Sequence, residues 1–351
     1  MPLDESQLKS EYSEKSVELR RQNAELKTVL QSYRREHGKL EVFFDEVKSA
    51  ITPVREYEPI ITKDAVKVGT LIEPAFHITD THKGARQEPN EIEGFNAYNP
   101  EIATERSLRF AEKAVRWANY QKQAYRIENA SIIITGDLIS GDIHDELRIT
   151  NAYPTPIQVV ESAKDIAAQI QIIAPHFKKV KVHFVVEDNH SRLTKKPQAK
   201  EAGTNSLNYL VGSMLQAYIA SLSNVEMNIY PMLEKVIEAN ERLYLLSHGH
   251  NVRGWMGVPW YGIERKVGRE SQARLQIIMQ EADRAREIGF HKYIIGHFHT
   301  AFFGRLYFLG ASLSGTDAYD HQAGRYDDPG QNAWLIHPKH GEFNMTTFYL
   351  A

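Results

Sequence analysis

Five short polar clusters, each directly after an apolar run, contain the residues of this chain that could do metal chemistry. Their donor atoms are all oxygen or nitrogen, which suit hard or borderline divalent cations. The clusters are Asp80-Thr81-His82, Gly136-Asp137, Asp188-Asn189-His190, His248-Gly249-His250 and Gly296-His297-Phe298-His299. Several strands that deliver such donors to one edge of a sheet predict a two-metal centre, of the kind that hydrolyses phosphate esters.

Two of the clusters hold a pair of donors two residues apart. These pairs are Asp80 with His82 and His297 with His299. On an extended strand end the two side chains of a pair would point the same way, so each pair could coordinate one ion. A glycine directly precedes Asp137 and His297, at points where the backbone has to turn sharply or pass close to the site.

The elements that must position these donors alternate along the chain, which predicts a layered α/β fold with β-sheets flanked by helices. In open sheets of this class, ligands bind at the carboxyl ends of the strands. The predicted strands are Ala75–Thr79, Ser131–Thr135, Val182–Val186, Leu243–Ser247 and Tyr293–Ile295, and the predicted helices cover residues 101–125, 155–175, 205–222 and 270–288. The catalytic domain is expected over residues 67–351.

An N-terminal segment, residues 1–55, has a different pattern. Residues 4–51 predict one long helix, with Tyr12, Leu19, Leu26, Tyr33, Leu40 and Val47 at every seventh position. An isolated helix is marginal in water, so it needs a partner. The seam favours a coiled coil that joins subunits into a homo-oligomer; packing on its own catalytic domain is the alternative.

Composition narrows the class of protein. The chain has 351 residues, 42% of them hydrophobic and 25% charged, with a net charge of −3 and no cysteine. The lack of cysteine excludes disulfides, zinc–thiolate sites and iron–sulfur clusters, and it fits a reducing compartment. No apolar run is long enough to span a membrane, and the N-terminus is too polar for a signal peptide. We therefore expect a cytoplasmic protein without a membrane partner.

The ordered series D-x-H, G-D, N-H, H-G-H and G-H-x-H, from residue 80 to residue 299, resembles the calcineurin-like metallophosphoesterase family. Its members include purple acid phosphatases, Mre11/SbcD nucleases, cyclic-nucleotide phosphodiesterases and phosphoprotein phosphatases. The ligand order is similar to that of the nucleases. The tail, residues 310–319 and 329–334, is similar to a phage and prophage subgroup, which would place the protein in the host cytoplasm. The family usually has glycine before Asn-His, where this chain has Asp188.

The resemblance implies two divalent ions and a hydroxide between them that attacks phosphorus in line. Manganese is the first choice of metal, and iron, zinc, nickel and cobalt are the others that such donors accept. His190 would protonate or electrostatically stabilise the leaving oxygen. The implied ligands are three for the first ion, one bridge and three for the second: Asp80, His82 and His299; Asp137; and Asn189, His248 and His297.

Four further residues are candidate substrate contacts. Arg192 and Arg253 follow two of the histidine clusters closely, and guanidinium groups suit phosphate oxygens. His250 is either a substrate contact or a plain buried histidine, because only one histidine of H-G-H is normally a ligand in the family. His144 is either a substrate or supporting residue or part of a solvent loop.

Three functions fit these residues. A phosphodiesterase or nuclease acting on DNA, RNA or nucleotides is favoured by the ligand order and by Trp255, Trp260 and Tyr261, which could stack on bases or could pack the loop onto the sheet. The net acidity opposes tight binding of duplexes. A phosphomonoesterase acting on nucleotides or phosphoproteins fits the same metals. A structural or assembly protein with a vestigial metal site is the third reading.

Overall fold

The chain forms two units, residues 1–61 and 62–351, which are described separately. The computed structural model describes residues 15–32, 34–35, 38, 69–253 and 257–351. Within these ranges, no helix is both long and apolar enough to cross a membrane.

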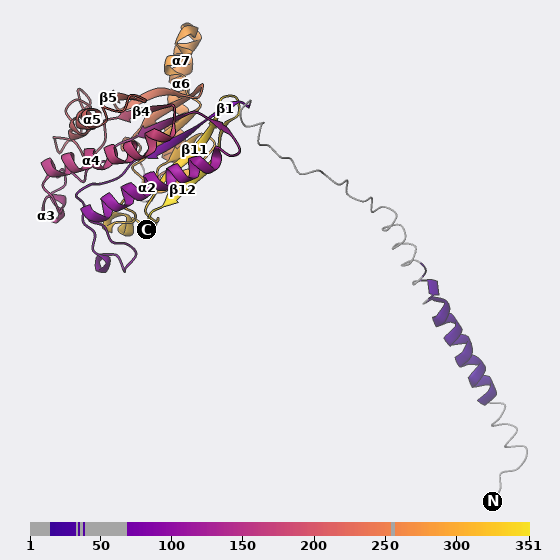
Figure 1. The fold of residues 1–351 in the computed structure, drawn as a ribbon. Coiled ribbons are helices and arrows are strands. Elements are labelled where there is room, and N and C mark those ends of the chain that lie inside the picture. The colour runs from indigo at the N-terminus through magenta and orange to yellow at the C-terminus, as the bar shows by residue number, and fades with distance from the viewer. Residues whose placement is uncertain (1–14, 33, 36–37, 39–68, 254–256) are drawn as a thin grey trace, which may run out of the picture. The chain divides into compact units, whose positions relative to one another are not determined.

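In the first unit, residues 15–32 form a helix, drawn in indigo in Figure 1. This stretch lies inside the helix predicted over residues 4–51; most of the remaining range, with the seam positions Tyr12, Tyr33, Leu40 and Val47, lies outside the described residues. Leu19 and Leu26 of the predicted seam are 58% and 66% exposed. Their pairing in a coiled coil stays a prediction.

The second unit contains a seven-stranded sheet. Its strands are β1 (Leu71–Ile78), β2 (Arg126–Ile127), β3 (Asn129–Ile134), β4 (Lys179–Val185), β5 (Val225–Tyr230), β11 (Gly330–His337) and β12 (Gly341–Tyr349). The order is β12-β11-β1-β3-β4-β5, with β2 paired to β1. β1, β3, β4 and β5 run parallel, and β11 and β12 extend the sheet antiparallel beside β1.

A second sheet has five strands: β6 (Glu234–Ala239), β7 (Arg242–Ser247), β8 (Lys292–Ile295), β9 (Phe302–Phe303) and β10 (Tyr307–Leu309). The order is β6-β7-β8-β10-β9. β7, β8 and β10 run parallel, while β6 and β9 close the two edges antiparallel.

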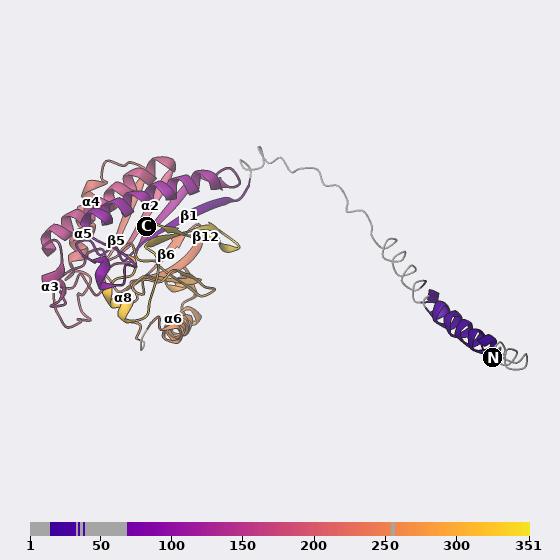
Figure 2. The same cartoon turned by 90° about the horizontal axis from the view of Figure 1, so that it is seen from below.

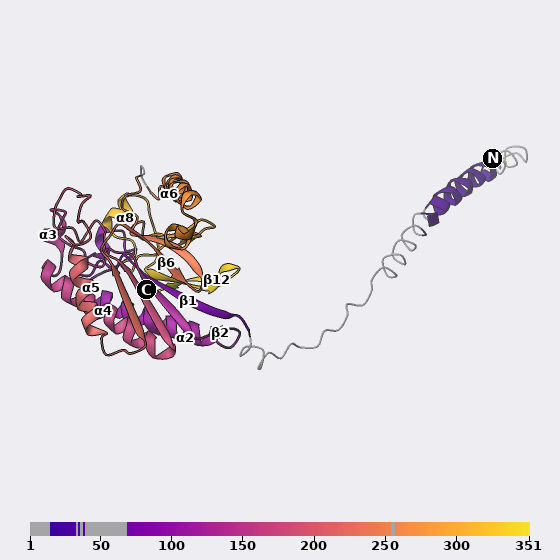
Figure 3. The same cartoon turned by 90° about the horizontal axis from the view of Figure 1, so that it is seen from above.

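Helices cover the outer face of each sheet (Figures 2 and 3). On the larger sheet lie α2 (Pro100–Gln121), α4 (Thr155–Ile173) and α5 (Leu207–Tyr218), and on the smaller sheet lies α6 (Trp260–Gln280). The shorter elements are η2 (Pro89–Glu91), α3 (Leu147–Thr150), η3 (Ala174–His176), η4 (Ala282–Arg284), α7 (Ala285–Ile288) and α8 (Ala318–Gln322).

Alternation along the strands explains why the sheets stack. Ile132 and Ile134 of β3 face the helices α2 and α4, while Ile133 between them faces the second sheet. Because successive side chains of a strand point to opposite faces, a strand that is apolar at every position has two faces to bury. The layered α/β prediction, with sheets flanked by helices, is therefore confirmed.

The positions of individual elements mostly follow the prediction. The five predicted strands and the first three helices are confirmed within a few residues. The fourth helix, α6, begins at Trp260 rather than near residue 270. In the first turns of α6 only Ile263 and Val267 are buried, and most of their neighbours are charged or polar. The apolar stripe is therefore too narrow to reveal from the sequence where the helix begins. The strands β5, β6, β11 and β12 were not predicted, because they do not precede a polar cluster.

Candidate metal centre

The five polar clusters lie at the carboxyl ends of strands, but these strands belong to two sheets. Asp80, Asp137 and Asn189 follow β1, β3 and β4 of the larger sheet, while His248 and His297 follow β7 and β8 of the smaller one. The prediction of one sheet edge was therefore too simple. Two sheets packed face to face share an end, and donors from both can converge there.

The first donor set consists of Asp80, His82 and His299. The Nε2 atoms of the two histidines are 3.0 Å apart, and Oδ1 of Asp80 lies 3.5 Å from that of His299 and 3.9 Å from that of His82. Such donors bind divalent ions at about 2.0–2.2 Å, so the donors of one ion lie roughly 3 to 4 Å apart. Two imidazole nitrogens that face one another beside a carboxylate have the spacing of a cation site.

The second donor set consists of Asp137, His248 and His297. His248 Nε2 lies 2.9 Å from Oδ2 of Asp137 and 3.0 Å from Oδ1 of Asn189. Asn189 thus brings its amide oxygen to the same place, which makes four donors. All seven predicted ligands fall into these two sets.

Asp137 lies next to both sets. Its carboxylate forms one group with His248 and His297, and another with His82 and His190, in each of which the donor atoms lie within 4.8 Å of one another. His82 also belongs to the first set. A carboxylate with two oxygens in this position fits the bridge that two neighbouring cations require.

Most of the ligand candidates have left-handed backbone, which is uncommon outside glycine. Strained backbone of this kind persists where the surrounding structure holds it, and it clusters at functional sites. The φ angles are 50° for Asp80, 43° for His82, 46° for Asp137, 69° for His297 and 55° for His299.

Asp188 holds the turn that carries Asp137. Its Oδ2 accepts a hydrogen bond from the backbone N–H of Asp137 at 2.7 Å and another from the Asn208 side chain, and its Oδ1 accepts from the backbone N–H of Ser191 at 2.8 Å. Gly136, at φ 101°, leaves room for the Asp188 side chain, which a Cβ there would crowd. Asp188 is therefore a buried carboxylate that ties two clusters together.

Gly296 allows the two sheets to meet at Asp80. A Cβ at Gly296 would overlap the side chains of Thr79 and Asp80. The Asp80 carboxylate also accepts hydrogen bonds from the backbone N–H of His297 at 3.0 Å and from the Thr79 hydroxyl at 2.7 Å. One carboxylate of the larger sheet thus fixes the backbone of the smaller one.

Two of the candidate ligand histidines, His299 and His248, are oriented through Nδ1. The Asp320 carboxylate lies 2.5 Å from Nδ1 of His299 and is itself paired with Arg325 at 2.6 Å. Nδ1 of His248 lies 2.9 Å from the Thr135 carbonyl oxygen. Such partners fix which nitrogen carries the proton and turn Nε2 toward the metal. The sequence did not reveal Asp320, because nothing in its spacing links it to His299.

Burial and neighbouring carboxylates shift the pKa values of these histidines in opposite directions. Burial alone would lower the pKa of His248, but Asp137 outweighs it and raises that pKa to about 9. Burial and Asp320 oppose each other in the same way at His299, whose pKa rises well above its ordinary value. Burial lowers the pKa of His82 to about 3. Because a histidine must be deprotonated to bind a metal, a cation that binds here displaces protons from His248 and His299.

A cavity of about 350 Å³ opens beside the two donor sets, and His144, His190 and Arg325 line it together with the ligands. A neighbouring cavity of about 340 Å³ shares His190 with it. Glu146 and Asp317 line both cavities, while the arginines of the linings, Arg325 and Arg86, are already paired with Asp320 and Glu88. The charge of the linings that no described ion pair offsets is therefore acidic.

His190, the candidate catalytic histidine, lies beside Asp137, the candidate bridging carboxylate. Its Nε2 is 3.9 Å from Oδ2 of Asp137, and its Nδ1 is 2.7 Å from the Ser140 carbonyl oxygen. The exposed His144 lies close by, with ring centres 5.8 Å apart.

The other candidate substrate contacts are not among the residues that line these two cavities. The ring centre of His250 is 5.7 Å from that of His248. Arg192 donates a hydrogen bond to the Asn189 carbonyl oxygen at 3.0 Å. Arg253 is exposed and lines a different cavity, beside α6.

No protein-family model matches the chain, and no curated protein matches its sequence. Among solved structures, it is similar over 80% of its length to a Staphylococcus aureus protein assigned as a 5'-nucleotidase, at 8% identity and a TM-score of 0.31, and spans 54% of that chain. It is similar over 79% of its length to a dimetal phosphatase from Danio rerio, at 12% identity and a TM-score of 0.34, and covers 99% of it.

A third similar structure is the calcineurin-like phosphoesterase YfkN from Bacillus subtilis, at 10% identity and a TM-score of 0.33, with 80% of this chain and 92% of that chain covered. At these TM-scores the likenesses establish neither the fold nor the activity of this chain, so both rest on its own residues.

Proposed function

We propose that this chain is a two-metal phosphoester hydrolase of the calcineurin-like type that cleaves phosphodiesters of DNA, RNA or nucleotides, with manganese as its metal. One observation carries the proposal: two sets of oxygen and nitrogen donors, from two sheets, share the carboxylate of Asp137. Two cations held around one carboxylate can lower the pKa of a water molecule and offset the charge of a phosphate in an in-line displacement.

The residues present fit two cations. Asp80, His82 and His299 would hold the first ion, and Asn189, His248 and His297 the second, with Asp137 between them. The facing Nε2 atoms of His82 and His299 support this most directly. They lie 3.0 Å apart next to a carboxylate, which is the spacing of two nitrogen donors that bind the same cation.

His190 supports the hydrolytic step. Its Nδ1–H donates to the Ser140 carbonyl oxygen, which leaves Nε2 facing the cavity beside Asp137. In the imidazolium form, Nε2–H would donate its proton to the oxygen that leaves phosphorus, as a general acid does.

The acidic lining of the cavity favours a diester over a monoester. A phosphomonoester carries up to two negative charges near neutral pH, whereas a diester carries one. Glu146 and Asp317, which line both parts of the cavity, repel the additional charge of the monoester.

The test is turnover of bis-p-nitrophenyl phosphate and p-nitrophenyl phosphate by the manganese-loaded protein, with Asp137→Asn as the control. We expect turnover of the diester to exceed that of the monoester and to be lost in the variant. A preference for the monoester would replace the proposal with a phosphomonoesterase. Binding of manganese without turnover of either ester would support a structural protein with a vestigial site.

A further inference from the structure

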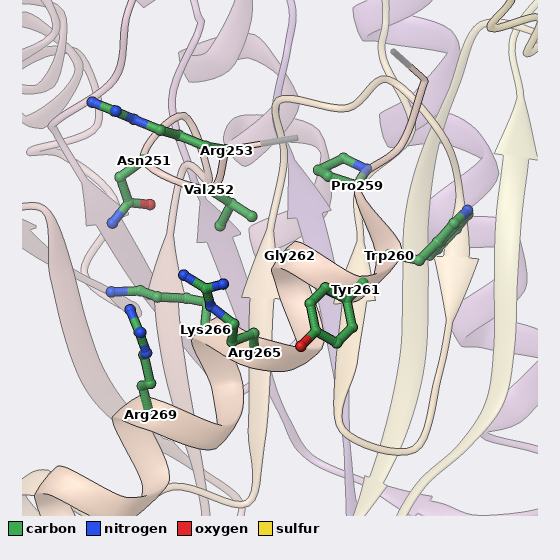
Figure 4. A pocket seen from close by; sticks show the side chains of 10 residues that line it. All are labelled: Asn251, Val252, Arg253, Pro259, Trp260, Tyr261, Gly262, Arg265, Lys266 and Arg269. Carbon is green, nitrogen blue, oxygen red and sulfur yellow. The ribbon is translucent and has the colours of Figure 1, made fainter. Parts of the chain in front are cut away.

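A third cavity, of about 700 Å³, lies beside the first turns of α6 and outside the metal centre (Figure 4). Its lining includes Arg253 from the loop after β7 and Arg265, Lys266 and Arg269 from α6. In Figure 4 the three side chains of α6 extend toward the side of the hollow where Asn251 lies. No acidic side chain belongs to the described lining, so the hollow is basic.

Of the four positive side chains that line this hollow, only Lys266 forms ion pairs with described acidic residues. Lys266 pairs with Glu234 and with Glu270, each at 2.8 Å. Among the described residues, Arg253, Arg265 and Arg269 make no ion pair and no side-chain hydrogen bond. Three arginines whose charges no described ion pair offsets therefore line one hollow, on a protein whose net charge is −3.

The placement of two of these arginines is unfavourable without an anion. Arg265 and Arg269 are four residues apart in α6, so they lie on one face of the helix and repel each other. An anion between them removes this repulsion, and a guanidinium can bind two phosphate oxygens at once.

The hollow lies within reach of the metal centre. Arg253 is five residues after the predicted ligand His248, and five residues of extended chain span at most about 18 Å. His250, on the same loop, packs near His248. A substrate with one phosphate at the metals and another in the hollow must therefore carry at least two phosphates.

Aromatic side chains at the hollow indicate which polyanion it takes. Tyr261 is 74% exposed and Trp260 is 42% exposed, and Trp260 is braced edge-on by Phe302 with ring centres 4.9 Å apart. Exposed rings beside a basic groove are the combination that binds the bases and the backbone of a single strand without reading its sequence.

We propose that the hollow lined by Arg253, Arg265 and Arg269 binds a phosphate of a single-stranded nucleic acid whose scissile phosphodiester lies at the metal centre. The proposal rests on the proposed phosphodiesterase function and names the substrate class. It also explains why α6 begins with exposed aromatic residues and a row of cations.

The test compares a fluorescent single-stranded oligonucleotide with bis-p-nitrophenyl phosphate, which has no neighbouring phosphate. In Arg265→Ala/Arg269→Ala, we expect kcat/KM for the oligonucleotide to fall at least about tenfold further than kcat/KM for the small diester, mainly through KM. The control is Arg116→Ala/Lys164→Ala, which removes two exposed positive charges from α2 and α4. Equal losses on both substrates, or an equal loss in the control, would overturn the proposal.

Binding by the Asp137→Asn protein, followed by fluorescence anisotropy, separates the two proposals. We expect the double arginine variant to lower the slope of log affinity against log salt by about 0.7, the value for the one phosphate contact that is lost. If no diester is hydrolysed, the hydrolase proposal fails, and this slope alone still decides whether the hollow binds the strand. An unchanged slope, or tighter binding of duplex than of single strand, contradicts the assignment of the hollow.

Discussion

The backbone N–H of Asp137 donates a hydrogen bond to Oδ2 of Asp188 at 2.7 Å, so one buried carboxylate positions another. Asp188 also accepts from Ser191, and it is fully enclosed by protein. It contacts no substrate and acts through Asp137, which makes it a positioning residue.

Asp188→Asn should therefore weaken both stability and metal binding. The variant places an amide N–H₂ against groups that donate, and an unpaired buried polar group costs about 1–3 kcal/mol. A lost supporting contact lowers metal affinity by about 10- to 100-fold. Denaturant unfolding and calorimetric titration with manganese measure the two effects. The matched control is Glu187→Gln at the neighbouring carboxyl group, which should change metal affinity little; similar losses in both variants would refute the positioning role.

His190→Gln should retain the metals and lose general-acid catalysis. Loss of a positioned acid typically costs about 10²- to 10⁴-fold when the leaving group is poor, and less when it is as good as nitrophenolate. Rates on an alkyl phosphodiester and on bis-p-nitrophenyl phosphate, with metal content measured in parallel, give the comparison. A uniform loss on both esters would show that His190 acts in some way other than as a proton donor.

Manganese should raise the melting temperature of the protein. A ligand at 100 times its dissociation constant stabilises the folded state by about 2.7 kcal/mol, which corresponds to about 4 to 5 °C for a domain of this size. Thermal unfolding with manganese and with a chelator measures the shift. Asp137→Asn should remove most of it, and a full shift in that variant would place the metal elsewhere.

His183, outside the metal centre, should make stability depend on pH. It is buried on β4 with Nδ1 3.1 Å from the Tyr230 hydroxyl, and burial lowers its pKa to about 4, with Lys181 acting in the same direction and Glu226 opposing it. The unfolded chain binds the proton near pH 6.5, whereas the folded protein does so near pH 4. The contribution of neutral His183 is therefore complete above pH 6.5 and falls as the pH falls toward 4, by on the order of 3 kcal/mol.

Urea unfolding of wild type and His183→Gln between pH 7 and pH 4.5 checks this dependence. The wild type should lose more free energy of unfolding on acidification than the variant does. The exposed His176 provides the control, because His176→Gln should leave the slope of the wild type in place. Parallel pH curves for wild type and His183→Gln would contradict the assignment.

We propose that the N-terminal helix joins subunits through the seam that contains Leu19 and Leu26. Both side chains are exposed in the described helix, and each buried leucine contributes about 1.5–3 kcal/mol. Leu19→Asp/Leu26→Asp should lower the mass measured by light scattering. Glu18→Asp provides a control on the same helix, and an unchanged mass in the leucine variant would exclude this seam as the interface.

Much of the metal centre could be predicted from the sequence because each ligand follows a strand that the apolar pattern marks. Asp80, Asp137 and His297 all stand one to three residues after such a strand, and the structure brings them together. The roles of Asp188 and Asp320 could not be predicted, because their partners are set by tertiary packing across 51 and 21 residues. Patterns of neighbouring residues do not predict contacts between residues so far apart in the sequence.

The grouping of the candidate substrate-binding arginines could not be predicted from the sequence either. Arg253 was predicted as a substrate contact from its place after a histidine cluster, but its neighbours in the cavity beside α6, Arg265 and Arg269, were not predicted. That grouping depends on where α6 begins, and the charged first turns of this helix hide its start from any hydrophobic pattern.

The five left-handed ligand candidates have a consequence for laboratory evolution. Each costs on the order of 1 kcal/mol relative to a glycine at the same position. A library of this protein selected only for folding should therefore accumulate glycine or asparagine at Asp80, His82, Asp137, His297 and His299. Selection for turnover should hold aspartate and histidine there, and the positions at which the two libraries diverge would outline the metal centre without a structure.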